Sequence, residues 1–219
     1  MRPLEEELSR QREMRANTQP EEDRLIGDKA NADLVSQQIN ARARKIGDVA
    51  PDFSLPDARG HQVTLSQLRS AGPVILSFYR GAWCPFCNLE LRGLQRALPE
   101  FQALGASLVA ISPQLPDSSL TLQEKHSLEF PVLSDVGNKV AKQYGIVFRV
   151  PDELLDVFQR RNVDLQSFNG QEGKNELPLP ATFIVDSEGK ICAAFVEEDH
   201  TIRLDPEEII TTLRELRAR

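Results

Sequence analysis

Two segments with different hydrophobic spacing meet near the middle of the chain. Residues 74–79, Val-Ile-Leu-Ser-Phe-Tyr, form a mostly apolar run rich in β-branched and aromatic side chains, which predicts a buried strand. After a turn through Arg80 and Gly81, apolar side chains recur at steps of four, three, four and three, which predicts one face of a helix. These positions are Cys87, Leu91, Leu94, Leu98 and Phe101. A core strand is therefore expected to lead directly into a long helix.

Similar patterns predict further elements on both sides of this unit. A short hairpin is expected before it, with strands over 53–55 and 62–64, followed by a helical turn over 66–69. After it, we expect extended segments over 106–112, 130–133 and 146–150, and helices over 118–128, 138–144, 152–161 and 205–216. A hairpin is expected over 181–196, and the polar segment 162–179 is expected to be a long loop. This order of elements is typical of a three-layer α/β fold with a mixed central sheet flanked by helices.

The first 45 residues differ from the rest. They are rich in Glu, Arg, Gln and Asn, and their few apolar residues suggest two amphipathic helices, the second beginning near Pro20. We therefore divide the chain into a charged helical extension, 1–45, and a domain, 46–219. The extension is interpreted as a solvated helical face or, alternatively, as an arm that docks a partner or a second copy. No chemistry is expected from it.

Composition narrows the classes of function. The chain has 219 residues and a formal net charge of −7, which disfavours nonspecific attraction to nucleic acid or to an anionic membrane. No apolar run approaches the roughly 18 residues that a membrane span needs, and the N-terminus shows no apolar core of a secretory signal. Three cysteines, two of them in one Cys-x-x-Cys, do not make a disulfide framework. A cytoplasmic redox protein fits these features best.

The Cys-x-x-Cys at the strand–helix junction carries the clearest chemistry. Pro85 suits the first helical position, which makes Cys84 the N-cap and puts Cys87 one turn inside the helix. The helix N-terminus stabilises an anion, so we expect a Cys84 thiolate to form below the pKa of about 8.5 of a free cysteine. Cys87 is then placed to attack a sulfur adduct on Cys84 and to close a disulfide. The alternatives are two packing cysteines or a zinc site, but no second Cys-x-x-Cys or close His pair supplies four metal ligands.

Several separate motifs resemble one family. The strand–Trp-Cys-x-x-Cys–helix arrangement resembles the thioredoxin fold. Residues 47–56, Gly-Asp-Val-Ala-Pro-Asp-Phe-Ser-Leu-Pro, and 130–135, Phe-Pro-Val-Leu-Ser-Asp, resemble peroxiredoxins of the alkyl hydroperoxide reductase/thiol-specific antioxidant superfamily. Residues 78–87, Phe-Tyr-Arg-Gly-Ala-Trp-Cys-Pro-Phe-Cys, are similar to a subgroup with a Cys-x-x-Cys active site. The resemblance covers about residues 46–217 and implies a thioredoxin-like fold.

The resemblance also implies roles for residues. Cys84 matches the peroxidatic cysteine, and Cys87 is its expected resolving partner. Pro180 matches the proline that is cis in thioredoxins and faces the Cys-x-x-Cys. Together with Trp83 and Gly81, it is expected to contact substrate.

Two positions depart from the family pattern. Typical peroxiredoxins have Thr or Ser where this chain has Gly81, and an Arg roughly where it has Pro180. Those groups stabilise charge on the peroxide as its O–O bond breaks, and one such preorganised donor is worth on the order of 3–4 kcal/mol in a hydrolase. Arg80 is the first candidate for a catalytic residue whose guanidinium replaces the missing Arg. Arg149 is the second candidate.

Three functions remain open from the sequence. The first is a thiol peroxidase that acts on hydrogen peroxide or organic hydroperoxides and is recycled by thioredoxin, glutathione or another thiol. The second is a thiol–disulfide oxidoreductase, and the third is a non-catalytic redox sensor whose N-terminal arm binds a partner. We expect no cofactor, because sulfur alone carries this chemistry, and we expect a homodimer as the assembly. Cys192 is interpreted as a packing residue and the pair Asp199-His200 as structural.

Overall fold

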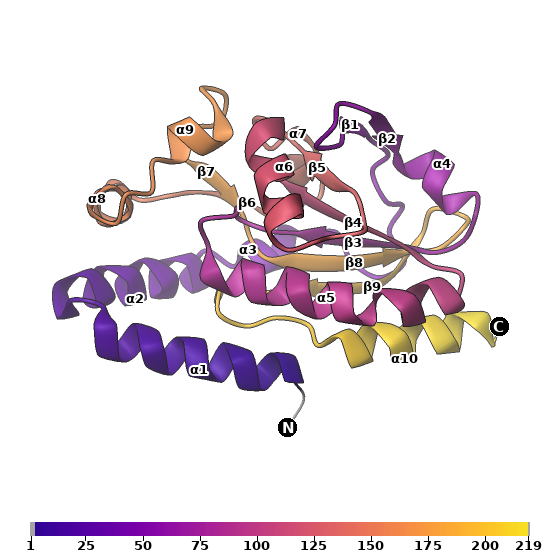
Figure 1. Ribbon diagram of the computed structural model, residues 1–219, viewed down its shortest axis with the longest axis horizontal. Helices are drawn as coiled ribbons and strands as arrows, with labels where there is room; N and C mark the ends of the chain where they lie inside the picture. The colour runs from indigo at the N-terminus through magenta and orange to yellow at the C-terminus, as the bar shows by residue number, and fades with distance from the viewer. Residues whose placement is uncertain (1–2, 219) are drawn as a thin grey trace.

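A five-stranded mixed sheet forms the centre of the protein, for which a computed structural model describes residues 3–218 (Figure 1). Its strands lie in the order β5-β4-β3-β8-β9. β3 pairs in parallel with β4 and β4 with β5, whereas β8 runs antiparallel to both β3 and β9. The predicted three-layer α/β fold is confirmed.

The strands are β1 (Ser54–Pro56), β2 (Gln62–Thr64), β3 (Val74–Phe78), β4 (Ser107–Ser112), β5 (Val132–Ser134), β6 (Val147–Arg149), β7 (Glu176–Pro178), β8 (Ala181–Val185) and β9 (Ile191–Val196). The helices are α1 (Pro3–Thr18), α2 (Glu21–Ser36), α3 (Ile39–Arg42), α4 (Leu65–Arg69), α5 (Pro85–Ala103), α6 (Pro116–Lys125), α7 (Lys139–Gln143), α8 (Asp152–Arg160), α9 (Leu165–Asn169) and α10 (Pro206–Arg217). None of these helices is long and apolar enough to cross a membrane.

Alternate residues of β3 enter two separate cores, which explains why its apolar run is continuous. Ile75 and Tyr79 pack on one face of the sheet with side chains from α1, α5 and α10. Val74, Leu76 and Phe78 pack on the other face with side chains from α3, α4 and α7. A strand covered on both faces has no position for an exposed polar side chain.

One expected loop contains regular structure. Residues 162–179 include the short helix α9 and the strand β7, which pairs antiparallel with β6. Asp164 caps α9 by accepting a hydrogen bond from the Gln166 N–H, a local signal in a segment that otherwise lacks an apolar period. The prediction of an unstructured loop is therefore wrong for these two stretches.

The N-terminal helices pack against the domain. Leu4 and Leu8 of α1 are buried against α5, and Arg96 of α5 pairs with Glu7 at 3.2 Å. Asp23 of α2 accepts a hydrogen bond from Arg160 Nε at 3.2 Å, which ties α2 to α8. Figure 1 shows α1 and α2 along the side of the domain where α5 and α8 lie. The predicted helices are confirmed, whereas the division at residue 45 stays a prediction, and its outer limits, residues 1 and 219, lie outside the described residues.

Candidate active site

Cys84 lies at the end of the turn that connects β3 to α5. It is the N-cap of α5, with extended backbone angles of φ −90° and ψ 113°, and Pro85 occupies the first turn. The Cys84 N–H donates to the Gly81 carbonyl at 3.1 Å, which closes the turn after β3. The predicted N-cap position is confirmed.

Side chains from two neighbouring segments hold the turn in place. The buried Gln114 accepts a hydrogen bond from the Ala82 N–H at 2.8 Å, and Asn88 donates from Nδ2 to the Ala82 carbonyl at 2.9 Å. Both peptide groups of Ala82 are thereby satisfied by side chains instead of water. This fixes the backbone from which Cys84 projects.

The two cysteines are both buried free thiols with different proton affinities. Hydrogen bonding from the Cys87 thiol and the positive charges of Arg80 and Arg203 lower the pKa of Cys84 to about 5, against the opposing effect of its burial. Burial raises the pKa of Cys87, as do the hydrogen bond to Cys84 and the charge of that sulfur. At neutral pH the pair therefore holds a thiolate on Cys84 and a thiol on Cys87, as the nucleophile and resolving partner need.

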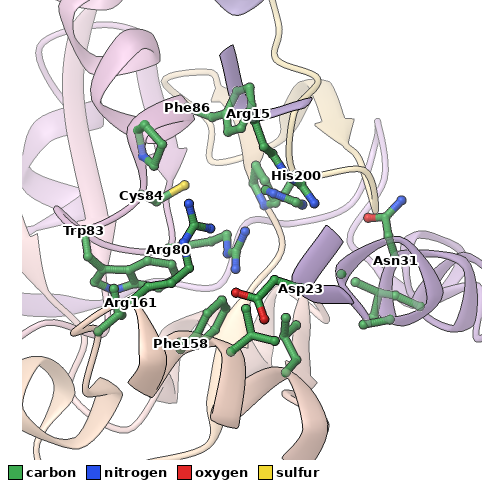
Figure 2. Close-up of a pocket in the computed structure, with 18 of the residues that line it drawn as sticks. Arg15, Asp23, Asn31, Arg80, Trp83, Cys84, Phe86, Phe158, Arg161 and His200 are labelled. Atoms are coloured by element: carbon green, nitrogen blue, oxygen red, sulfur yellow. The ribbon is translucent and has the colours of Figure 1, made fainter. Parts of the chain in front are cut away.

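Arg80 points into the site. Its side chain is 5% exposed, and its guanidinium carbon lies 5.0 Å from the centre of the Trp83 ring and 5.8 Å from that of Phe158. Figure 2 shows Arg80 in the same pocket as Cys84. Arg149, the second candidate, lies at the pocket edge with its side chain 75% exposed and paired with Asp152.

Gly81 is required by the position of Trp83. Its φ of +149° is one that side-chain-bearing residues rarely adopt, and an added Cβ would lie 2.9 Å from Trp83 Cδ1 and closer still to Nε1. Trp83 packs on Phe158 with ring centres 5.1 Å apart. The indole thus fills space next to the position where typical peroxiredoxins, which this sequence resembles, carry Thr or Ser.

Pro180 lines the same pocket, but its peptide bond is not cis. All peptide bonds in residues 3–218 are trans, so the resemblance to the thioredoxin cis-proline is wrong on this point. The trans form is favoured by about 0.5–1 kcal/mol before a proline, and the backbone on both sides of this bond is hydrogen-bonded to neighbouring segments. The Leu179 N–H donates to Ile146 at 2.7 Å, and the Pro180 carbonyl accepts from Glu197 at 3.4 Å.

The N-terminal extension forms one wall of a cavity of about 420 Å³ in front of Cys84. Arg15 of α1 and Asp23 of α2 line it, together with Arg161 and His200 from the domain (Figure 2). Apolar side chains from α1, α2, α5, β6 and α8 and from the turn before α5 complete the lining, and they include Met14, Leu34, Trp83, Phe86, Phe148, Leu154, Val157 and Phe158. No chemistry was predicted for the extension, and its place in the cavity wall is a feature that the sequence pattern did not indicate.

His200 also faces this cavity. Its ring meets Phe86 edge to face at 5.7 Å. Burial, together with the charges of Arg80, Arg15 and Arg203, lowers the pKa of His200 well below its ordinary value. The imidazole is therefore neutral at neutral pH, and it adds no positive charge to an already cationic site.

Sequence reasoning missed two buried charges next to Cys87. Arg203 donates from Nη2 to Cys87 Sγ at 3.4 Å and from Nε to Glu90 at 2.6 Å. One signal was available for Glu90, because it follows Cys87 by three residues and lies on the apolar face of α5, where a carboxylate needs a partner. Arg203 lies in the polar segment before α10, and no local pattern marks it.

The described residues contain no group of three or more His, Cys, Asp or Glu side chains arranged to hold a metal ion. Cys192, by contrast, lies away from the other two cysteines on β9, 3.5 Å from Asp186 Oδ2.

Comparisons with known proteins agree with this geometry. A model of the AhpC/TSA family matches residues 46–194. Peroxiredoxin Bcp of Escherichia coli strain K12 is 36% identical over 102 residues, so the match spans 47% of this chain and only 65% of that relative. A putative peroxiredoxin of Mycobacterium tuberculosis strain H37Rv is 31% identical over 148 residues, 68% of this chain and 82% of the relative. The crystal structure of peroxidoxin BcpB from Mycobacterium tuberculosis superposes with a TM-score of 0.62 and 28% identity, covering 78% of this chain and 97% of that one.

Proposed function

Because this chain belongs to the AhpC/TSA family, we propose that it is a thiol-dependent peroxidase that reduces hydroperoxides. The observation that carries the proposal is the placement of Cys84. The thiol sits at the N-terminus of α5, beside the buried Arg80 guanidinium, and faces a cavity large enough for a small organic molecule.

In the first step, the Cys84 thiolate attacks one oxygen of the hydroperoxide. The S–O bond forms as the O–O bond breaks, which gives a sulfenic acid on Cys84 and an alkoxide or hydroxide that takes a proton. Arg80 supplies positive charge at the point where that negative charge develops, in place of the groups that Gly81 and Pro180 do not offer.

In the second step, the Cys87 sulfur attacks Cys84 and releases water, leaving an intramolecular disulfide. An external thiol then reduces the disulfide by exchange. We propose thioredoxin or a glutathione-type thiol as that reductant, in a cytoplasmic setting where thiols are kept reduced. We also propose a homodimer, which sedimentation velocity on the full chain tests.

The cavity supports organic hydroperoxides as substrates in addition to hydrogen peroxide. Its volume of about 420 Å³ and its wall of aromatic and aliphatic side chains offer a binding surface that hydrogen peroxide does not need. Trp83 and Pro180 line this cavity and act as substrate-contacting positions. Gly81, which is not among the residues that line it, contributes by leaving room for the indole.

A thiol–disulfide oxidoreductase is the second candidate. Gly81 and Pro180 favour it, since both replace groups that assist peroxide reduction in typical peroxiredoxins. The burial of Cys84, which is 2% exposed behind helices α1 and α2, weighs against attack on a protein disulfide.

The rate at which reduced protein loses thiols to one equivalent of hydrogen peroxide or cumene hydroperoxide separates these functions. The peroxidase predicts loss far faster than that of a simple thiolate, abolished in Cys84→Ser. Loss at the simple-thiolate rate, together with rapid reduction of insulin disulfides, would select the oxidoreductase instead.

A further inference from the structure

Arg203 is a buried charge in direct contact with the second cysteine, Cys87, in addition to its smaller effect on the pKa of Cys84. Its side chain is 1% exposed, and that of Glu90 is 2% exposed. The two come from distant parts of the chain: Glu90 lies in the second turn of α5, and Arg203 lies in the segment that connects β9 to α10.

Each nitrogen of the Arg203 guanidinium has a specific partner. Nε donates to Glu90 Oε2 at 2.6 Å, and Nη1 donates to the backbone carbonyls of His200 and Ile202. Nη2 donates to Cys87 Sγ at 3.4 Å. Three of these four contacts orient the guanidinium, and the fourth is directed at a sulfur atom.

Burying this pair of charges costs free energy of desolvation. Buried ion pairs are often no more stable than apolar side chains of similar volume, because desolvation offsets their attraction. The core of this domain could therefore have been closed with apolar residues at both positions. Instead, a permanent positive charge lies in contact with the thiol that must become a nucleophile.

We propose that Arg203 is a catalytic residue for disulfide formation, which holds Cys87 as a thiolate for its attack on oxidised Cys84, and that Glu90 is the positioning residue that fixes Arg203. This inference rests on the proposed function in that Cys87 resolves an adduct on Cys84.

The surroundings of Cys87 give the activation an order in time. In the reduced protein, burial and the hydrogen bond and negative charge of Cys84 raise the pKa of Cys87, while Arg203 and Arg80 lower it. Glu90 and Tyr79 also face Cys87; burial raises the pKa of Glu90 to about 7 and raises that of Tyr79. Conversion of Cys84 to a neutral sulfenic acid removes the negative charge and leaves both guanidinium groups. Cys87 therefore becomes easier to deprotonate only after Cys84 has reacted, which protects the hydrogen bond that stabilises the Cys84 thiolate beforehand.

The step balances without an added oxidant or reductant. The Cys87 sulfur forms a bond to Cys84 Sγ as the S–O bond of the sulfenic acid breaks. The hydroxide that leaves takes the proton given up by the Cys87 thiol, so one thiol and one sulfenic acid become one disulfide and one water.

The test uses 5,5′-dithiobis(2-nitrobenzoate), so it does not depend on peroxide chemistry. In full-length protein carrying Cys192→Ser, Cys84 reacts with one equivalent of the reagent and releases one thionitrobenzoate. Attack by Cys87 on the resulting mixed disulfide then releases a second, and stopped-flow absorbance at 412 nm resolves the two releases.

The double variant Arg203→Met/Glu90→Leu removes both buried charges. We expect it to slow the second release about tenfold to a hundredfold, more than the first, with its pH midpoint shifted upward. Arg203→Lys should recover part of the rate, because it keeps a charge without the planar fork. The matched control is Glu100→Leu/Arg214→Met, an exposed pair that joins α5 to α10, and it should leave both releases unchanged.

A second release at the wild-type rate and pH midpoint in the double variant would overturn the proposal, as would equal slowing of both releases without a pH shift. If the double variant does not fold, titration of thiolate absorbance at 240 nm decides, in Cys84→Ser/Cys192→Ser with Arg203 and with Arg203→Gln. Cys87 should ionise at higher pH in the Arg203→Gln protein, and an unchanged or lower midpoint would overturn the proposal. If the second thionitrobenzoate release depends on Arg203 but the protein does not consume peroxide, only the proposed peroxidase function is contradicted.

Discussion

The Arg80 guanidinium lies 5.0 Å above the centre of the Trp83 indole, three residues along the same turn. The indole in turn packs on Phe158 of α8, so one aromatic surface holds the cation next to Cys84. A guanidinium stacked on aromatic rings is stabilised without a carboxylate partner. The positive charge of Arg80 therefore remains available to the Cys84 thiolate and to the oxygen that is released when the O–O bond of the hydroperoxide breaks.

Replacement of Arg80 should both destabilise the Cys84 thiolate and remove the positive charge that stabilises the leaving oxygen of the peroxide. We expect Arg80→Met to lower the second-order rate constant for peroxide about tenfold to a thousandfold, because it removes both a stabilising charge and a transition-state donor. Stopped-flow tryptophan fluorescence measures this rate constant. Arg149→Met, which removes an exposed arginine at the pocket edge, should leave it within about twofold, since surface charges are largely screened. Equal rates for Arg80→Met and the wild type would remove Arg80 from the mechanism.

The pH dependence of Cys84 reactivity follows from its lowered pKa. Because the pKa of Cys84 is about 5 in the folded protein, compared with about 8.5 for a free cysteine, the thiolate predominates above about pH 6 and is lost as pH falls through 5. The rate of peroxide-dependent thiol loss should therefore rise with pH through a midpoint near 5 and stay level from pH 6.5 to 8. In Arg80→Met the midpoint should move upward. A midpoint near 8.5 in the wild type would show that Cys84 is not activated.

Gly81 should resist conversion to the residue of typical peroxiredoxins. We expect Gly81→Ala to reduce the free energy of unfolding by about 2–4 kcal/mol, from backbone strain plus overlap with Trp83, and Gly81→Thr to reduce it further. Neither variant should gain peroxidase activity, because the indole must move to admit the side chain. Urea unfolding measures the loss.

Gly60→Ala is the control for backbone strain alone. Gly60 has a φ of +86° with nothing within 4 Å of an added Cβ. We expect a cost of about 1 kcal/mol there. If the two alanine variants lose equal stability, the overlap with Trp83 is not the reason for Gly81.

The buried carboxylate of Asp23 should influence organic substrates through the cavity wall. Asp23→Asn weakens the link from α2 to Arg160 of α8 and should raise the KM for cumene hydroperoxide by up to about tenfold, with a smaller effect on hydrogen peroxide. Steady-state kinetics with both substrates makes the comparison.

Lys29→Met provides the control on the same two helices. Lys29 pairs with Glu153 at 3.4 Å, but both side chains are about two-thirds exposed (66% and 68%), so their link contributes little. An equal change of KM for both substrates in Asp23→Asn, or an equal effect of Lys29→Met, would argue against a substrate-binding wall.

The sequence by itself determined the central unit of this protein. The apolar run before Arg80, the helical spacing after Pro85 and the N-cap cysteine between them all act within one strand and one helix, so local patterns predict them. The family motifs and the order of strands and helices follow from the same kind of signal. The segment 162–179, where no apolar period is present, contains a helix and a strand that were not predicted. The short helix α3 was also not predicted as separate from α2.

The tertiary structure alone decided what surrounds Cys84 and Cys87. Arg203 reaches Cys87 from 116 positions away in the sequence, and Arg15 lines the cavity from an extension outside the family match. That the bond before Pro180 is trans, where the resemblance suggested cis, is likewise seen only in the folded chain. A charge acts on a thiol through distance and burial, and neither quantity has a period along the chain, so these partners appear only when distant segments are folded together.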